Sequence, residues 1–315
     1  GPGALEFLNR LSANQIDRPV GKVIYTQMCN QRGTIECDLT IGRVAEDRKL
    51  LTVGTAFGLR VSWWITHHLP TDGSVSFKEV TSAFAVINVI GPKSRDLLQK
   101  LTSADISNES FPFGTCKNFS LGYAPVMSFR ITYVGELGYE LYVPTEFGAH
   151  VYESLWEAGQ DLGIKNAGYR AISSLHLEKG YADWGSELTP EYTPYDAGLG
   201  FCVALNKADF IGKEALAKIK AEGPKWKLCT FTLEYTESLM LQGSAPIIHK
   251  GKVLGVTSSA GYGHTLGKNI CYGYILVDDA VYEDGYEIEI YKKIYPAKRE
   301  DNRALYDPER KRILS

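Results

Sequence analysis

The chain changes character near Gly223 and Pro224, and this change limits the folds that it can adopt. After that point, β-rich runs follow one another at short intervals, separated by turn residues such as KGK and GYGH. Closely spaced short strands are typical of a small β-barrel or β-sandwich. The runs are LCTFTLEY (228–235), SAPIIHKGKVLGVTSSA (244–260), ICYGYILV (270–277) and GYEIEIYKKIYPAKR (285–299). The sequence therefore predicts an all-β domain over residues 222–315.

Residues 1–221 combine strands and helices instead. Two hairpins are predicted, over 22–44 with a third strand at 49–56, and over 126–144 with its turn at Gly135 to Gly138. Leucines at helical spacing and terminal glycines predict helices over 91–102, 145–163 and 167–180, the second of them capped by Thr145. The whole chain is thus expected to be α+β, with a mixed body followed by an all-β domain.

Composition excludes several classes of protein. With Lys+Arg 34 and Asp+Glu 37, the net charge is −3, and the basic stripe of a nucleic-acid-binding protein is missing. No apolar stretch approaches the roughly 18 residues of a membrane span, and no secretory signal is visible. The six scattered cysteines form no C-x-x-C pair, which predicts free thiols, no metal site and a reducing compartment. We therefore expect a cytoplasmic location, or the mitochondrial matrix in a eukaryote.

Two carboxylates lie on predicted strands. Asp38 follows a glycine turn, and alternation places it with Glu36 and Thr40 on one strand face and Cys37 and Leu39 on the other. Glu140 begins the second strand of its hairpin, where a carboxylate can accept two parallel N–H bonds from a flat amino-amide edge such as that of a pterin or purine. The alternative for each is an ordinary acid on a solvated face.

A third candidate is Arg170, in the first turn of the helix over 167–180. A cation gains nothing from the dipole at that end, so it is either committed to a ligand carboxylate or paired with a nearby acid. The G-x-G in SAGYGH (259–264) lacks the strand-to-helix context of a dinucleotide site and is interpreted as a hairpin turn. No motif of a metalloprotease, a serine hydrolase or a P-loop occurs.

Several stretches together resemble one family, the folate-binding aminomethyltransferases, whose type member is the T component of glycine cleavage. Within it, the chain is most similar to the C-terminal folate domain of dimethylglycine and sarcosine dehydrogenases. The stretches follow the family's order along nearly the whole chain: GTIECDLTI (33–41), YVGELGYELYVP (133–144), AGYRAISSLHLEKGYADWGSELTPEYTPYDAGLGF (167–201), LNKADFIGKEAL (205–216) and LYDPERKRI (305–313).

The resemblance assigns each functional residue of the family to a position in this chain. The family's essential aspartate, beside the folate nitrogens that receive the one-carbon unit, falls on Asp38, and the pterin-binding glutamate falls on Glu140. The arginine of the A-R-x-S-L-R-L-E helix, which meets the folate's glutamate tail, is assigned to Arg170. An aromatic residue that packs on the folate falls on Phe201, and Tyr133 would line the pocket. Glu136 is expected to be a turn residue.

The implied activity is capture of the one-carbon unit from oxidative demethylation of dimethylglycine or sarcosine, as 5,10-methylenetetrahydrofolate. The implied fold is a folate-binding body over 1–221, without the family's first strands, closed by a C-terminal β-barrel over 222–315. The cofactor would be tetrahydrofolate. FAD would be needed only in an amine-oxidase domain outside this chain, because no G-x-G-x-x-G start is present.

Two other interpretations remain. One is a free-standing aminomethyltransferase or demethylase that uses folate without flavin. The other is a non-catalytic module like the regulatory subunit of pyruvate dehydrogenase phosphatase, because GPGALEFL (1–8) and TSAFAVINVIGP (81–92) resemble that branch as well. Retention of Asp38, Glu140 and Arg170 favours catalysis, because a scaffold needs none of them.

Overall fold

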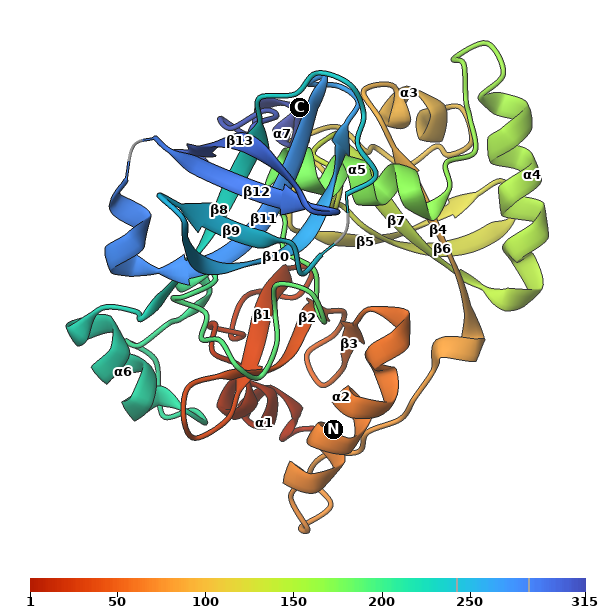
Figure 1. The fold of residues 1–315 in the computed structure, drawn as a ribbon. Coiled ribbons are helices and arrows are strands. Elements are labelled where there is room, and N and C mark those ends of the chain that lie inside the picture. Colours follow the sequence, from red (N-terminus) through yellow and green to blue (C-terminus); the bar gives the residue numbers. More distant parts are fainter. Residues whose placement is uncertain (242, 283) are drawn as a thin grey trace.

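The computed structural model describes residues 1–241, 243–282 and 284–315. Three β-structures lie around a common centre: a small sheet near the N-terminus, a second sheet from the middle of the chain, and a barrel from the last third (Figure 1). The expected α+β class is confirmed. Among the helices of the described residues, none has the length and apolar character needed to cross a membrane.

The first sheet has the antiparallel order β1-β2-β3, formed by Val23–Cys29, Ile35–Arg43 and Lys49–Thr52. The hairpin and third strand expected from the sequence are therefore confirmed. One face of this sheet packs on α1 (Ala4–Leu11) and α2 (Gly58–His68), where Cys37, Leu39 and Ile41 are buried. Because side chains alternate along a strand, the polar residues of β2 point to the opposite face.

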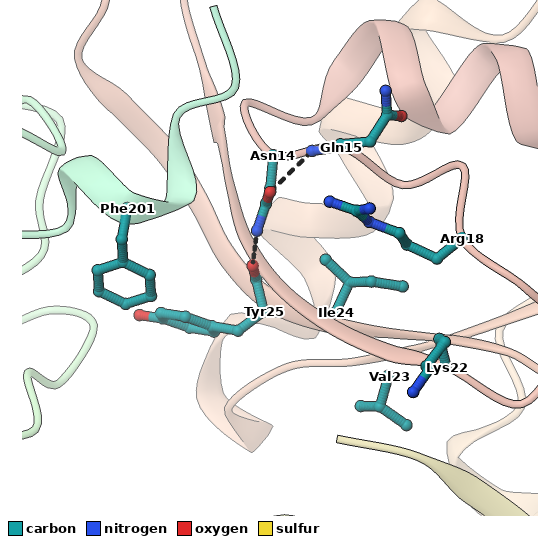
Figure 2. A pocket seen from close by; sticks show the side chains of 8 residues that line it. All are labelled: Asn14, Gln15, Arg18, Lys22, Val23, Ile24, Tyr25 and Phe201. Atoms are coloured by element: carbon teal, nitrogen blue, oxygen red, sulfur yellow. Dashed lines mark hydrogen bonds between the residues drawn. The ribbon is translucent and has the colours of Figure 1, made fainter. Parts of the chain in front are cut away.

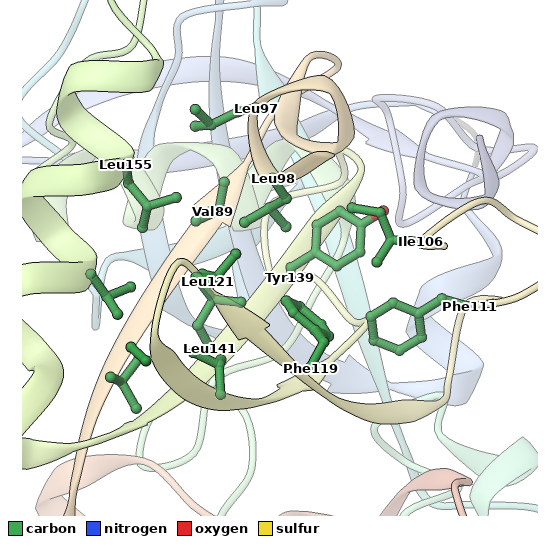
Figure 3. Packing of buried hydrophobic residues seen from close by; sticks show 14 of the residues in the cluster. Val89, Leu97, Leu98, Ile106, Phe111, Phe119, Leu121, Tyr139, Leu141 and Leu155 are labelled. Carbon is green, nitrogen blue, oxygen red and sulfur yellow. The ribbon is translucent and has the colours of Figure 1, made fainter. Parts of the chain in front are cut away.

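The second sheet has the order β4-β7-β6-β5, formed by Phe84–Ile90, Gly138–Pro144, Ala124–Phe129 and Cys116–Leu121. Figure 3 shows its apolar face covered by α3 (Ser94–Gln99) and α4 (Gly148–Ala158), around Tyr139 and Leu141 of β7. The second predicted hairpin is present, but residues 130–137 join its strands as a longer connection.

The predicted N-cap Thr145 is wrong. It begins a 3₁₀ turn, η3 (Thr145–Phe147), and its hydroxyl donates to Ser82 O, so α4 begins three residues later without a side-chain cap. The remaining helices of the body are α5 (Tyr169–Lys179), which ends at Gly180 with φ +77° as its sequence predicts, and α6 (Lys213–Glu222). The other 3₁₀ turns are η1 (Thr55–Phe57), η2 (Thr81–Ala83), η4 (Gly200–Cys202) and η5 (Val277–Val281).

The last third forms a closed barrel, which decides between the two all-β architectures expected. Its order is β10-β11-β8-β13-β12-β9, from Lys252–Gly263, Lys268–Leu276, Trp226–Leu233, Lys293–Glu300, Tyr286–Ile290 and Pro246–His249. The hairpin turn expected in SAGYGH is present but lies slightly further along the chain: Gly261 and Gly263 still pair with β11, and residues 264–267 connect the two strands. Gly261 packs closely on α5, since a Cβ there would lie 3.0 Å from Leu177.

The segment after the barrel, 301–315, returns to the body and includes α7 (Lys311–Leu314). Lys179 Nζ of α5 lies 3.0 Å from Asp307 Oδ2, and both side chains are almost fully buried. The backbone N–H groups of Leu305 and Tyr306 donate to Glu178 O. Glu136, expected to be a turn residue, accepts hydrogen bonds from the Tyr306 hydroxyl and from Arg312.

The polar face of the first sheet meets the second sheet at very short range. Gly42 of β2 lies against the ring of Phe129 of β6, and a Cβ on Gly42 would come within 2.3 Å of that ring. Phe129 is fully buried and packs against Tyr142 at 4.7 Å between ring centroids. Only glycine allows the two sheets to approach this closely.

We expect Gly42→Ala to destabilise the chain by about 1–3 kcal/mol or more, because the buried Phe129 ring cannot move aside without displacing a sheet. Urea unfolding would measure the loss. Gly58→Ala is the matched control, since a Cβ there meets nothing within 4 Å at the start of α2. If Phe129→Leu recovers none of the loss in the Gly42→Ala background, the contact is not its cause.

Candidate functional site between the two sheets

Asp38 lies on the polar face of β2, opposite Gln27 of β1. Gln27 Nε2 donates to Asp38 Oδ1 at 2.8 Å. Burial raises the pKa of Asp38 to about 6, although hydrogen bonds from Gln27 and Tyr25 oppose the rise. The face predicted from alternation is therefore correct, but it is not a freely solvated one. A carboxylate with this pKa can hold or release a proton near neutral pH.

Glu140 lies on β7, on the face opposite the buried Tyr139 and Leu141. It accepts a hydrogen bond from the Tyr142 hydroxyl at 2.7 Å, and that hydroxyl lies 2.8 Å from Thr52 Oγ1 of β3. Burial raises the pKa of Glu140, and the Tyr142 bond opposes the rise. A polar chain thus runs from the second sheet to the first.

These hydrogen bonds connect the two strand faces that carry the carboxylates. Thr52 pairs with Thr40, which lies two residues after Asp38 on the same face of β2. Phe129, which meets Gly42 of that face, pairs with Glu140 in the second sheet. The faces that carry Asp38 and Glu140 are therefore turned toward each other.

Beside Asp38, Gln27 leaves one polar atom without a partner. Its side chain is fully buried, and Oε1 has no donor among the residues that the structure describes. A buried carbonyl without a donor is costly, so such an atom commonly marks a place where a ligand or water donates. The facing surfaces of the two sheets thus carry two carboxylates and a free amide acceptor, groups that can accept hydrogen bonds from N–H donors.

Tyr133 lies in the connection before β7, beyond the end of β6. Its hydroxyl donates to Ala182 O at 3.0 Å, and its ring stacks on His176 at 5.3 Å between centroids. Burial, followed by the charges of Asp183, Glu187 and Asp38, raises the pKa of Tyr133 well above its ordinary value. The charge of Asp38 thus acts on Tyr133, and the lining of a folate pocket by Tyr133 stays a prediction.

Phe201 lies in η4 and is 73% exposed. Figure 2 shows its ring and that of Tyr25 facing the same pocket of about 410 Å³, with the basic side chains of Arg18 and Lys22 on its other side. Neither Asp38 nor Glu140 lines this pocket. Tyr25 connects the two regions, because its hydroxyl hydrogen-bonds Asp38.

Arg170 lies apart from the other candidates. It is exposed, and no ion pair or hydrogen bond of its side chain occurs within the described residues. Successive residues of an α-helix are about 100° apart around its axis. Arg170 therefore lies about 20° from Leu177, which packs on the barrel. It lies about 120° from His176, which stacks on Tyr133. The family motif A-R-x-S-L-R-L-E can also be aligned on its last residues, S-L-x-L-E. That alignment puts the arginine of the motif at Ile172, which lies about 40° around the helix axis from His176.

Two family models match the chain. The GCVT N-terminal domain matches residues 1–207, and the glycine cleavage T-protein C-terminal barrel domain matches residues 227–307. The chain belongs to the glycine cleavage T-protein family. The resemblance drawn from the sequence is therefore confirmed.

The proteins similar to this chain have different functions. The mitochondrial dimethylglycine dehydrogenase of Mus musculus is 37% identical over 99% of this chain and 36% of its own length. The mitochondrial pyruvate dehydrogenase phosphatase regulatory subunit of Mus musculus is 34% identical over 95% of this chain and 36% of its own length. The chain thus spans little more than a third of these curated relatives.

A solved structure supports the fold. The glycine cleavage system aminomethyltransferase T from Bartonella henselae superposes with a TM-score of 0.85, over 98% of this chain and 82% of its own, at 22% identity. The mixed body and six-stranded barrel are therefore the aminomethyltransferase fold.

Some residues of this candidate site escaped sequence analysis. Tyr25 and Gln27 alternate on β1 opposite β2, so the predicted hairpin register could have found them. Tyr142 and Thr52 needed the packing of two sheets. Within the described residues, no group of three or more His, Cys, Asp or Glu side chains could hold a metal ion.

Asp38 makes folding depend on pH. Its pKa is about 6 in the folded chain and about 4 when unfolded, so between these values the folded state holds a proton that the unfolded state has released. The free energy of unfolding therefore falls as pH rises through this window, by about 3 kcal/mol in total, and stays lowered above it.

We expect Asp38→Asn to remove this penalty. Its gain in the free energy of unfolding over the wild type should be about twice as large at pH 8 as at pH 5, as measured by urea unfolding. Asp161→Asn, at an exposed acid paired with Lys100, should give no such gain. A gain for Asp38→Asn that is equal at both pH values would contradict the burial of its charge.

Proposed function

We propose that this chain binds tetrahydrofolate and captures a one-carbon unit from dimethylglycine or sarcosine as 5,10-methylenetetrahydrofolate. The observation that carries the proposal is the polar chain from Glu140 through Tyr142 to Thr52, which turns Glu140 toward the face that holds Asp38. Folate supplies the nucleophilic nitrogens. The unpartnered Gln27 Oε1 beside Asp38 supports a ligand with N–H donors.

Each residue would have a distinct task. Glu140 accepts two N–H groups from the amino-amide edge of the pterin, and Tyr142 fixes the orientation of its carboxylate. Asp38 faces the reacting nitrogens, stabilises the positive charge of the iminium-type donor and can hold a proton at its carboxylate. Tyr133 and Phe201 would contact the ring system, and the role of Arg170 stays a prediction.

Similarity to dimethylglycine dehydrogenase supports a methylated glycine as donor. Oxidation of that amine would take place on FAD in an amine-oxidase domain outside these residues. A free-standing aminomethyltransferase is the nearest alternative, supported by the Bartonella henselae fold. A regulatory module is a second alternative, supported by similarity to the phosphatase regulatory subunit. A location in the cytoplasm, or in the matrix of a eukaryote, also stays a proposal.

Glu140→Gln should weaken tetrahydrofolate binding roughly tenfold to a hundredfold, because two charge-assisted hydrogen bonds lose their charge. Isothermal calorimetry with reduced folate would measure the change. Glu146→Gln, at an exposed acid in η3, is the matched control and should bind as the wild type does. If the wild type, Glu140→Gln and Glu146→Gln bind tetrahydrofolate with equal affinity, Glu140 does not anchor the pterin.

Asp38→Asn should keep folate binding within a few-fold but slow one-carbon transfer by about a hundredfold or more, because the developing charge loses its carboxylate. The measurement is formation of 5,10-methylenetetrahydrofolate from a formaldehyde-equivalent donor, above the uncatalysed rate. Folate binding by the wild type without any such transfer would instead favour the regulatory module.

A further inference from the structure

The pocket of about 410 Å³ beside Phe201 lies along β1, an outer strand of the first sheet (Figure 2). Its lining comes from three parts of the chain: the loop before β1 (residues 14–18), residues 22–25 at the start of β1, and Phe201 of η4. The proposed function assigns ligand contact to Phe201 alone among these residues, so the rest of the lining has no ligand in it.

The lining contains two basic side chains, Arg18 and Lys22, and no acidic one. Both are exposed, and neither side chain forms an ion pair or a hydrogen bond with any residue that the structure describes. The acid next to Arg18 in the sequence, Asp17, is paired with Arg43 at 2.9 Å. Two cations without an acidic partner make this side of the pocket suited to an anionic group such as a carboxylate.

The opposite side of the pocket is aromatic. The rings of Tyr25 and Phe201 face it, and most of the Phe201 side chain is exposed although it is large and apolar (Figure 2). Ligand pockets are lined mainly by apolar and aromatic side chains with a few polar groups, and a flat ligand ring can stack on such rings or meet them edge to face. The pocket therefore combines a surface for an aromatic ring with a surface for an anion.

Buried hydrogen bonds fix the loop that forms one wall of this pocket. Lys207 is almost fully buried, and its ammonium group donates to Ser12 O and Asn14 O. The side-chain amide of Asn14 donates to Tyr25 O at 2.9 Å, which ties the loop to β1. The wall is thus held in place before any ligand binds, and this lowers the cost of ordering the site on binding.

The pocket lies next to Asp38 along β1. Tyr25 and Gln27 share one face of β1, because side chains alternate along a strand, and Gln27 Nε2 donates to Asp38 Oδ1 at 2.8 Å. Lys22 directly precedes β1, three residues before Tyr25 and about 10 Å from it along an extended strand. A ligand that follows β1 away from Asp38 therefore passes the Tyr25 ring before it reaches Lys22.

We infer that this pocket binds the aminobenzoyl-glutamate part of tetrahydrofolate, and that Arg18 and Lys22 bind the carboxylates of its glutamate. The aminobenzoyl ring packs on Tyr25 and Phe201. This inference rests on the proposed function.

The order of chemical groups in the ligand matches the order of residues along β1. In tetrahydrofolate the aminobenzoyl ring begins at N10, one of the two nitrogens that receive the one-carbon unit, and the glutamate follows the ring. With N10 at Asp38, the ring reaches Tyr25, and the glutamate then lies beside the two cations. The glutamate thus has a binding site other than Arg170, which lies apart from the other candidates on α5.

The test compares tetrahydrofolate with an analogue in which an amide NH₂ replaces the glutamate, so that both ring systems stay and both carboxylates are lost. Isothermal calorimetry would measure both affinities. We expect the wild type to prefer tetrahydrofolate about tenfold and the double variant Arg18→Gln/Lys22→Gln to lose this preference, because two exposed ion pairs together contribute about that much. The analogue should bind both chains within about twofold. Phe201→Ala should weaken both ligands about twofold to tenfold, since both keep the ring.

Two variants serve as controls. Lys93→Gln, at an exposed cation before α3, and Arg170→Gln should each leave both affinities unchanged. The inference is overturned, and the proposed function left intact, if the wild type binds both ligands equally, if its preference survives in the double variant, or if Arg170→Gln removes it. Unchanged affinities in Phe201→Ala would overturn the placement of the ring. A wild-type chain that binds neither ligand overturns the inference and the proposed function together.

Discussion

The close approach of Gly42 to the ring of Phe129 is the contact on which the site depends. Without it, the polar face of the first sheet would stand apart from the second, and its acids would be solvated. With it, Thr52 reaches Tyr142, and Tyr142 orients Glu140. A single missing side chain thus brings the polar faces of the two sheets into direct contact.

The burial of acidic side chains at this contact is costly to the chain. Burial raises the pKa values of Asp38 and Glu140, so each carboxylate is less stable when ionised than it would be in water. The hydrogen bonds from Gln27, Tyr25 and Tyr142 recover only part of this cost. Groups held in this way are common where a ligand later supplies the missing partners, since structural positions seldom retain such a penalty.

The sequence was most informative where a short-range pattern determines the structure. Alternation in 33–44 placed Asp38 on the correct face because the period of a strand is two, and Gly180 ended α5 because that position needs a positive φ. The closely spaced strands after residue 222 predicted a barrel or a sandwich, and pairing of β9 with β10 closes it into a barrel.

Where tertiary packing decides, the sequence was insufficient. Thr145 donates to a distant carbonyl instead of capping its helix, and the glycines of SAGYGH lie at the end of a strand packed on α5, just before the hairpin turn. Arg170 was assigned by motif, but the face of a helix depends on register, and a shift of two residues changes it by about 200°.

The buried ion pair between Lys179 and Asp307 has a consequence for how the molecule comes apart. If the segment after the barrel detaches, the buried charge of Lys179 loses its partner Asp307, and an unpaired charge in that position is severely unfavourable. The Leu305 and Tyr306 amides and the Tyr306 hydroxyl would be released at the same step. The barrel and the body are therefore bound into one cooperative unit, in which the melting of either half removes the support of the other.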